Sequence, residues 1–209
     1  LTTNHEHGGA DTGIEFLAST KGALIKRITM PYPADSKEEL LELVRANLTS
    51  KTKMILLSHV ETVTGLRWPI KEVSELIRGR DILFIVDGAQ APGMFHIDLQ
   101  DLGCDVYACS GHKWIMGPKE TGILYLRQGI QDRVNNVFIA GGYDVYSASS
   151  GTRNAPIIIG FGDVIDWHMA LGTSRIERHC MKLAKYCYSE LKKIKSINGA
   201  AFDSVLNII

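Results

Sequence analysis

The amino-acid sequence predicts an α/β protein with three layers, in which a mostly parallel sheet has helices on both faces. Two observations carry this prediction. Short apolar runs with β-branched residues alternate with segments of helical periodicity, and polar residues end two of these runs, where parallel strands open onto a crevice. With 209 residues, 45% of them hydrophobic, the chain can bury a full core.

Four apolar runs are the candidate strands. They span residues 23–28, 54–58, 82–87 and 106–110, and their composition suits parallel strands that are buried on both faces. Leu1-Thr2-Thr3 resembles the end of another strand, and the apolar run 205–209 closes the sequence with nothing after it to pack against. We therefore expect the sequence to be part of a longer polypeptide.

Two helices are predicted between these strands. Ser36 and Glu39 have the spacing of a capping box, and four apolar residues then share one helical face: Leu40, Leu41, Val44 and Leu48. Pro69 can open a second helix that ends before Gly79, with its apolar side chains directed inward: Ile70, Val73 and Ile77. Strand, helix, strand, helix and strand in this order indicate a parallel sheet.

The last part of the sequence has the pattern of a long amphipathic helix. After a break at Gly172, apolar residues recur at intervals of three and four over 176–194. Cys180 and Cys187 fall on this apolar face, and we expect both to be small core residues. Residues 1–160 are predicted to form a large domain, and 161–209 a helical connection toward a small domain that is mostly missing.

Composition and charge exclude several classes of function. Lysine plus arginine and aspartate plus glutamate each number 23, so no basic excess favours a nucleic-acid groove or an anionic membrane. No apolar run is long enough to span a bilayer, and no signal-peptide pattern is present. The four cysteines are too few and too irregularly spaced for a disulfide framework or paired zinc knuckles. We expect a cytoplasmic protein without a membrane or nucleic-acid partner.

Asp87 and Lys113 are the candidate functional pair. Asp87 ends an apolar strand, where a carboxylate is costly unless it meets a cation or strong donors. Lys113 follows the end of the next strand in Ser-Gly-His-Lys, and a lysine in a partly desolvated crevice can become a nucleophile toward a carbonyl. The spacing alone leaves a simple Asp-Lys ion pair across the strand ends equally open.

Several motifs in order resemble the class V aminotransferase group of pyridoxal-phosphate enzymes, which includes cysteine desulfurases and isopenicillin-N-epimerase-like proteins. The most specific are VDGAQA at 86–91 and DVYACSGHKWIMGP at 105–118, followed by GILYL at 122–126. NHEHGGAD, SHVETVTGLRWPIKEV and GTRNAPIIIGFGDVIDW complete the family's order. The resemblance covers most of the chain and implies the large domain of a fold-type-I enzyme with pyridoxal 5'-phosphate as its cofactor.

The resemblance assigns roles to three residues near the strand ends. Lys113 corresponds to the lysine that holds the cofactor as a Schiff base. Asp87 corresponds to the carboxylate that faces the pyridine nitrogen and keeps it protonated, so that the ring can accept electrons from the substrate's Cα. Gln90 corresponds to the donor to the cofactor's phenolic oxygen; without the resemblance it would be an ordinary turn residue.

The resemblance also assigns the phosphate-binding and stacking residues. Ser110 and His112, on either side of Gly111, correspond to phosphate ligands, with the glycine letting the backbone approach. Thr152 resembles a threonine that reaches the phosphate from a second subunit, which implies a homodimer with a shared active site. His7 corresponds to the residue that stacks on the pyridine ring. The pair His5 and His7 does not indicate a metal site, because no third ligand is apparent.

The sequence thus predicts an enzyme that acts at the α carbon of an amino acid. The motifs favour the epimerase-like, aminotransferase branch, since Thr62 stands where the desulfurase pattern has asparagine. Cysteine desulfurase or C–S lyase chemistry is the alternative. An alternative of another class is a non-catalytic structural or interaction fragment with a vestigial site. The arginine that binds the substrate carboxylate and the desulfurase cysteine are expected beyond Ile209.

Overall fold

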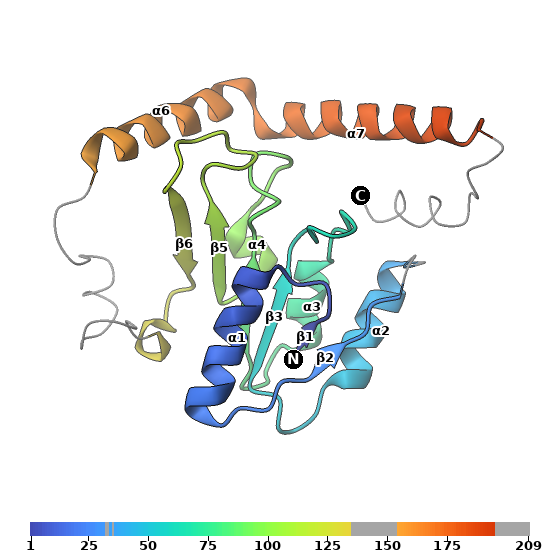
Figure 1. The fold of residues 1–209 in the computed structure, drawn as a ribbon, viewed down its shortest axis with the longest axis vertical. Coiled ribbons are helices and arrows are strands. Elements are labelled where there is room, and N and C mark those ends of the chain that lie inside the picture. The colour runs from blue at the N-terminus through green and yellow to red at the C-terminus, as the bar shows by residue number, and fades with distance from the viewer. Residues whose placement is uncertain (32–33, 35, 135–153, 195–209) are drawn as a thin grey trace.

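A computed structural model describes residues 1–31, 34, 36–134 and 154–194 (Figure 1). Strands and helices alternate over the first two thirds of the chain, and two long helices follow. In chain order they are β1 (Thr2–Thr3), α1 (Gly8–Lys21), β2 (Arg27–Ile28), α2 (Lys37–Asn47), β3 (Met54–Ser58), α3 (Ile70–Leu76), β4 (Leu83–Asp87), α4 (Leu99–Leu102), β5 (Val106–Ser110), β6 (Gly122–Leu126), the 3-10 helix η1 (Gln131–Arg133), α6 (Ala155–Leu171) and α7 (Thr173–Leu191).

The sheet is mostly parallel. Its four-stranded part has the order β3-β4-β5-β6, in which β3, β4 and β5 are parallel and β6 is antiparallel to β5. The short strands β1 and β2 pair in parallel. The amino group of Leu1 donates to Met54 O at 2.8 Å and Leu56 N donates to Leu1 O at 3.0 Å, so β1 extends the sheet beside β3.

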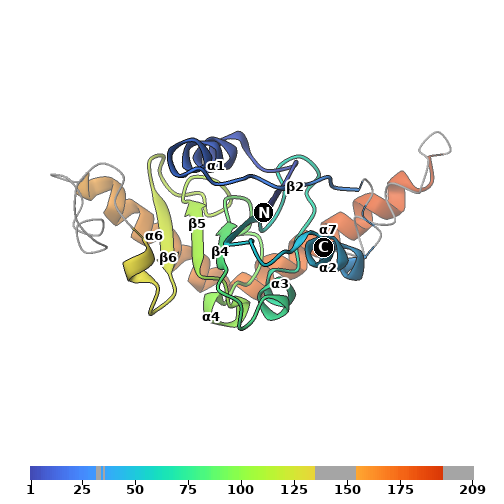
Figure 2. The ribbon, with the colours of Figure 1, turned by 90° about the horizontal axis from the view of Figure 1, so that it is seen from below.

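Helices cover both faces of the sheet, which confirms the predicted three-layer architecture. α1 lies on one face, and α3 and α4 lie on the other (Figure 2). The core between α2, α3 and the sheet consists of apolar side chains, because the apolar faces of the two helices pack against the inward residues of β3 and β4. Its fully buried members include Leu40, Val44, Ile55, Leu57, Ile70, Val73 and Val86.

The predicted strands and helices are confirmed with small differences in their bounds. β3 and β5 have the predicted residues, and β4 starts one residue later. The run 23–28 is a strand only at its end, since Gly22 caps α1 with a φ of 68° and Leu24 is 95% exposed in the connection. The Ser36 hydroxyl accepts from Glu39 N at 3.1 Å and caps α2 as expected. α1 and β6 had not been predicted.

α6 and α7 run across the edge at which the parallel strands end (Figure 1). Gly172, with a φ of 83°, separates them as predicted. The proposed domain boundary after residue 160 falls inside α6, and the division into a domain and a connection stays a prediction. None of the described helices is apolar over a length that would cross a bilayer.

The prediction that Cys180 and Cys187 are core residues is wrong. Cys180 is only partly buried and Cys187 is exposed. The reason is the position of α7: the helix contains no buried residue, because it lies across the edge of the sheet rather than on a face. The described residues therefore leave the apolar face of α7 only partly covered.

Candidate functional site

The site lies at the edge where three parallel strands end. The register pairs Ser58 of β3 with Asp87 of β4, and Asp87 with Ala108 of β5, two residues before Ser110. Carboxyl ends of neighbouring parallel strands open onto one crevice, so the topology brings Asp87 and the Ser-Gly-His-Lys segment to the same edge. This much of the predicted pairing follows directly from the register.

Asp87 is half-buried and its carboxylate is held in place. Oδ1 accepts a hydrogen bond from Ala89 N at 2.9 Å, which orients the group on the turn after β4. Burial, and to a lesser degree the Asp87 carboxylate, raises the pKa of the Cys109 thiol. Among the described residues no ion pair joins Asp87 to Lys113, so the simple ion-pair alternative is not what the structure contains.

Lys113 lies in a tight loop after β5. Gly111 N donates to Thr121 O and Gly117 N donates to Gly111 O, both at 2.8 Å, so the loop is closed on each side of the lysine. His168 of α6 donates from Nε2 to Ile115 O at 2.9 Å and so attaches the same loop to α6. The Lys113 side chain is half-buried and pairs with no carboxylate of the described residues. Its amine is available for a ligand.

Gly111 has a packing role that the sequence did not predict. Its N–H is already bonded to Thr121 O, so that N–H does not approach a phosphate. A Cβ here would lie 2.3 Å from Thr121 Oγ1 and 2.7 Å from Phe161 Cε2, and one at Gly117 would meet Phe161 at 2.6 Å. The glycine is needed because Thr121 and Phe161 of α6 lie directly on the loop, and the approach of the backbone to a phosphate at this segment stays a prediction.

The polar side chains beside Lys113 carry donors that the described residues leave unused. Ser110 is half-buried and His112 is exposed, and neither side chain has a hydrogen-bond partner in the described part of the chain. A hydroxyl and an imidazole so placed are donors that fit a phosphate, while the neighbouring Lys113 amine is left for the cofactor's aldehyde. Thr152, the predicted donor from a second subunit, lies outside the described residues.

The loop that carries His7 is fixed to the end of β3. Glu6 is 8% exposed, and its carboxylate accepts from Ser58 Oγ at 2.7 Å and from Thr3 Oγ1 at 2.8 Å. Desolvation raises the pKa of Glu6, and the two hydroxyl bonds oppose this. Since Ser58 is the residue that pairs with Asp87, Glu6 holds the next residue, His7, close to the edge where Asp87 lies.

A second carboxylate secures the same loop. Glu61 is 1% exposed and accepts from His5 Nδ1 at 2.9 Å, Trp68 Nε1 at 3.0 Å and Thr64 Oγ1 at 2.6 Å. Three donors compensate the cost of burying this carboxylate. Glu6 and Glu61 were not predicted from the sequence, where the only signal is that each acidic residue comes three residues after a strand, β1 and β3 respectively.

His7 itself is exposed and begins α1. Its Nδ1 accepts from Gly9 N at 3.1 Å, so this imidazole caps the helix and its Nε2 faces outward as the remaining polar atom. His5 and His7 use their Nδ1 atoms in different interactions. Within the described ranges, no group of three histidine, cysteine, aspartate or glutamate side chains is arranged to hold a metal ion.

Gln90 is oriented as a donor by its neighbours. Its Oε1 accepts from Trp114 Nε1 at 2.9 Å, and its Nε2 lies 3.3 Å from Thr62 Oγ1. Because the indole N–H can only donate, it fixes which end of the amide faces Trp114 and leaves the NH₂ group on the side of Thr62. The role of Gln90 as a donor to the cofactor's phenolic oxygen stays a prediction.

A buried pair beneath the site is uncharged. His59 Nδ1 and Tyr107 Oη are 2.9 Å apart, and both side chains are 2% exposed. Burial, assisted by the nearby Arg67 cation, lowers the pKa of His59 to about 3. Burial also raises the pKa of Tyr107. Both pKa shifts favour the uncharged forms, so the pair packs beneath the strand ends as a neutral hydrogen-bonded pair.

Among the known proteins similar to this chain are an isopenicillin N epimerase and a probable cysteine desulfurase, two proteins named for different activities. The chain is 30% identical over 197 residues to isopenicillin N epimerase of Amycolatopsis lactamdurans, covering 85% of the chain and 50% of that protein. It is 32% identical over 210 residues to a probable cysteine desulfurase of Halalkalibacterium halodurans, covering 94% of the chain and 51% of that protein. The chain thus spans about half the length of these curated relatives.

A solved structure shares the fold. The complex of a cystine C-S lyase with its reaction product cysteine persulfide aligns with a TM-score of 0.85 at 21% identity, covering 98% of this chain and 58% of that one. This confirms the predicted large-domain fold of fold-type-I enzymes. The family model described as aminotransferase class-V matches residues 1–204. The resemblance drawn from the motifs is confirmed, and the chain belongs to the class V aminotransferase family.

Proposed function

We propose that this chain is the cofactor-binding part of a pyridoxal-phosphate enzyme that acts at the α carbon of an amino acid. The observation that carries the proposal is the juxtaposition, at one sheet edge, of a fixed carboxylate at Asp87 and an unpaired lysine at Lys113. Family membership supports the cofactor. Bound at this edge, the cofactor would supply an electron sink for a bond broken at the substrate's Cα.

We assign each residue of the site a task. Lys113 offers the amine that holds the cofactor's aldehyde and, once released from it, moves the Cα proton. Asp87 holds a proton on the pyridine nitrogen. Gln90 donates to the phenolic oxygen, and His7 stacks on the ring. Ser110 and His112 bind the phosphate, with Thr152 of a second subunit completing the donor set.

The reaction that follows is proposed to be of the epimerase-like, aminotransferase type. Thr62 supports this choice, because the desulfurase pattern has asparagine at its position. Cysteine desulfurase or C–S lyase activity is the second candidate, supported by the relative from Halalkalibacterium halodurans. Sulfide release from cysteine distinguishes the two, since racemisation and transamination leave the Cβ–S bond intact.

The test of the proposal is covalent attachment of the cofactor to Lys113. After incubation with pyridoxal phosphate and reduction with borohydride, peptide mapping should find the modified residue at 113, and Lys113→Ala should remain colourless. Lys119→Ala, an exposed lysine of the same loop, is the matched control and should label like the parent. Label on another lysine would reject the assignment, and a protein that never binds the cofactor would favour the non-catalytic fragment.

A further inference from the structure

We propose that the cavity between α7 and the sheet edge binds the substrate's side chain, and that the substrate is an amino acid with a large apolar side chain, of the size of methionine or phenylalanine. This inference rests on the proposed function and adds the substrate class to it. The cavity has a volume of about 430 Å³. Ligand sites commonly have volumes of this order, about 300–1,000 Å³.

One wall of the cavity belongs to the candidate cofactor site. Thr62, Gln90 and Trp114 line it, and the same three residues are joined by the hydrogen bonds of the Gln90 amide. Gln90 follows Asp87 by three residues, and Trp114 directly follows Lys113. A group that extends from a substrate held at the strand ends therefore has this cavity beside it.

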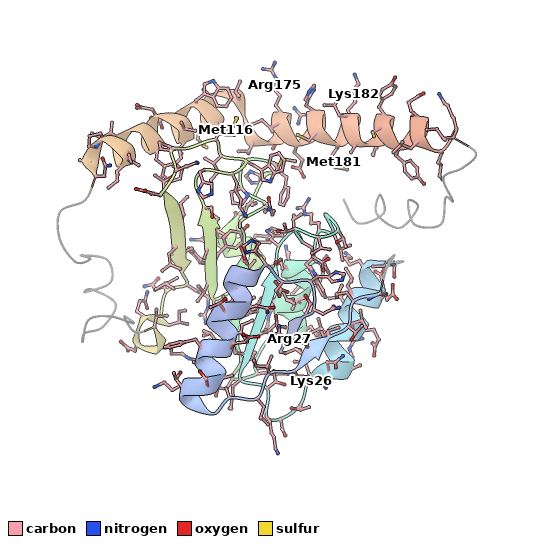
Figure 3. The ribbon with its side chains drawn as sticks, viewed as in Figure 1. Lys26, Arg27, Met116, Arg175, Met181 and Lys182 are labelled. Carbon is pink, nitrogen blue, oxygen red and sulfur yellow. The ribbon has the colours of Figure 1, made fainter. Side chains whose placement is uncertain are left out.

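The remaining lining comes from three segments, the connection after β3, the connection after β4 and α7, and the last two supply most of its apolar side chains. Met94 and Phe95 belong to the connection after β4, while Met181 and Ala184 belong to α7. Figure 3 shows Met181 on the side of α7 that faces the sheet, whereas Arg175 and Lys182 extend from the other side. α7 thus gives the cavity an apolar roof at Met181 and Ala184 and directs Arg175 and Lys182 away from it.

The lining has three charged side chains, of which Arg67 and Glu177 are paired with each other, and the third, Glu61, is 1% exposed with its carboxylate already taken by three hydrogen-bond donors. Arg67 Nη1 lies 3.5 Å from Glu177 Oε1, and the Arg67 guanidinium lies over the Phe95 ring at 3.8 Å from its centroid. A paired cation and anion present no net charge that would attract an ionised side chain, and the stacked arginine leaves the Phe95 ring edge to apolar contacts. The charge distribution therefore favours an uncharged guest.

The size of the cavity argues against a small side chain. A cysteine side chain has a single methylene and a thiol, so it would leave most of a 430 Å³ space without contacts. An aromatic or thioether side chain would contact both Phe95 and the α7 roof. Shape and polarity thus select the same substrate class.

Filling the cavity from its roof tests the inference. In the full protein loaded with pyridoxal phosphate, L-phenylalanine and L-alanine are titrated while the cofactor absorbance is followed. We expect phenylalanine to bind more tightly by about tenfold or more, and Ala184→Phe to remove about that factor while alanine binding stays nearly unchanged. Lys185→Phe adds the same ring to the exposed neighbouring position and should change neither titration.

The outcomes separate this inference from the proposed function. Trp114 fluorescence provides a second readout in protein free of cofactor: phenylalanine should alter the emission, and Trp114→Phe should abolish the change. If cofactor never binds but this change occurs, the proposed function fails and the cavity assignment stands. Three results would each overturn the inference. They are equal binding of both amino acids, no selective effect of Ala184→Phe, and occupation of the cavity by protein residues outside the described ranges. Should Ala184→Phe not fold, Ala184→Leu fills less of the space.

Discussion

At the scale of single residues, Tyr107 explains why a glycine follows the strand-end aspartate. A Cβ at Gly88 would lie 2.0 Å from Tyr107 Cε1 and 2.4 Å from Tyr107 Oη. Tyr107 is fixed by its contact with buried His59, so the ring has no room to move aside. The Asp-Gly pair in the VDGAQA motif therefore combines the carboxylate proposed to face the cofactor with a packing requirement at the next position.

Gly88→Ala is expected to destabilise the fold. Overpacking of a filled core costs about 1–3 kcal/mol, and the rigid ring places this substitution at the upper end of that range. The free energy of unfolding, measured by denaturant titration, should fall accordingly. Gly162→Ala in α6 is the matched control, because nothing lies within 4 Å of the added methyl group and alanine favours a helix. An unchanged free energy of unfolding in Gly88→Ala would contradict the packing account.

Asp87→Asn is expected to keep the fold and the bound cofactor but to lose catalysis. A neutral amide has nearly the same shape, yet it cannot hold the proton on the pyridine nitrogen. Exchange of the substrate's α proton with deuterated solvent, followed by NMR, should slow by about 100-fold or more, the size of effect seen when one electrostatic stabiliser is removed. Asp81→Asn alters an exposed carboxylate and should exchange normally. Unchanged exchange in Asp87→Asn would show that its role is misassigned.

The sequence was sufficient for the residues that sit at strand ends. Asp87, Gln90 and Lys113 could be placed at one edge because parallel topology alone determines where strands end. Glu6 and Phe161 could not be predicted. Glu6 meets Ser58 and Phe161 meets Gly111 across about fifty residues of sequence, and no local periodicity encodes such contacts.

At the scale of elements, local signals predicted the helices whose ends are chemically marked. α2 has a serine cap and a buried apolar face, and both were legible in the sequence. α7 has an equally clear apolar stripe but no buried residue, since amphipathicity reveals that a helix has an apolar face and not how much of it is covered. For this reason Cys187 was predicted to be buried in the core and is instead exposed.

Ser36→Ala tests whether the cap of α2 contributes to stability. Loss of the hydroxyl that accepts from Glu39 N should lower the free energy of unfolding by about 1 kcal/mol, the usual contribution of an N-cap. Thermal or denaturant unfolding followed by circular dichroism measures it. Ser19→Ala serves as the control, because Ser19 only donates to a carbonyl within exposed α1. Equal stability of both variants would mean that tertiary packing alone holds the start of α2.

At the scale of the whole molecule, β1 joins the edge of the sheet and α6 and α7 cross its carboxyl end (Figure 1). The loop before α1, the strand ends and α6 therefore converge on one crevice from distant parts of the chain. Sequence patterns predicted that strands and helices alternate and that the strands are mostly parallel. They did not predict β6, which follows the Lys113 loop and pairs with β5 in antiparallel orientation.

The final prediction is that the active unit is a dimer whose sites are shared. Its motivation is Thr152, which by family resemblance reaches the phosphate from a second subunit, and the limited donor set formed by Ser110 and His112 within one chain. Mixing Lys113→Ala chains with Thr152→Ala chains tests it, because each variant alone is defective in both sites of its own dimer.

A shared site makes the hybrid dimer partly active. In a two-fold symmetric dimer, one site then takes Lys113 from the second variant and Thr152 from the first, both intact, while the other site carries both substitutions. If each chain instead supplies its own Thr152, one site lacks the lysine, the other lacks the threonine, and neither is intact. Recovery of the borohydride-trapped cofactor and of α-proton exchange on mixing supports the shared site. Absence of recovery in a hybrid confirmed by differently tagged chains rejects it. Lys119→Ala chains mixed with Lys113→Ala chains are the control and should show no gain, because exchange leaves their number of intact sites unchanged.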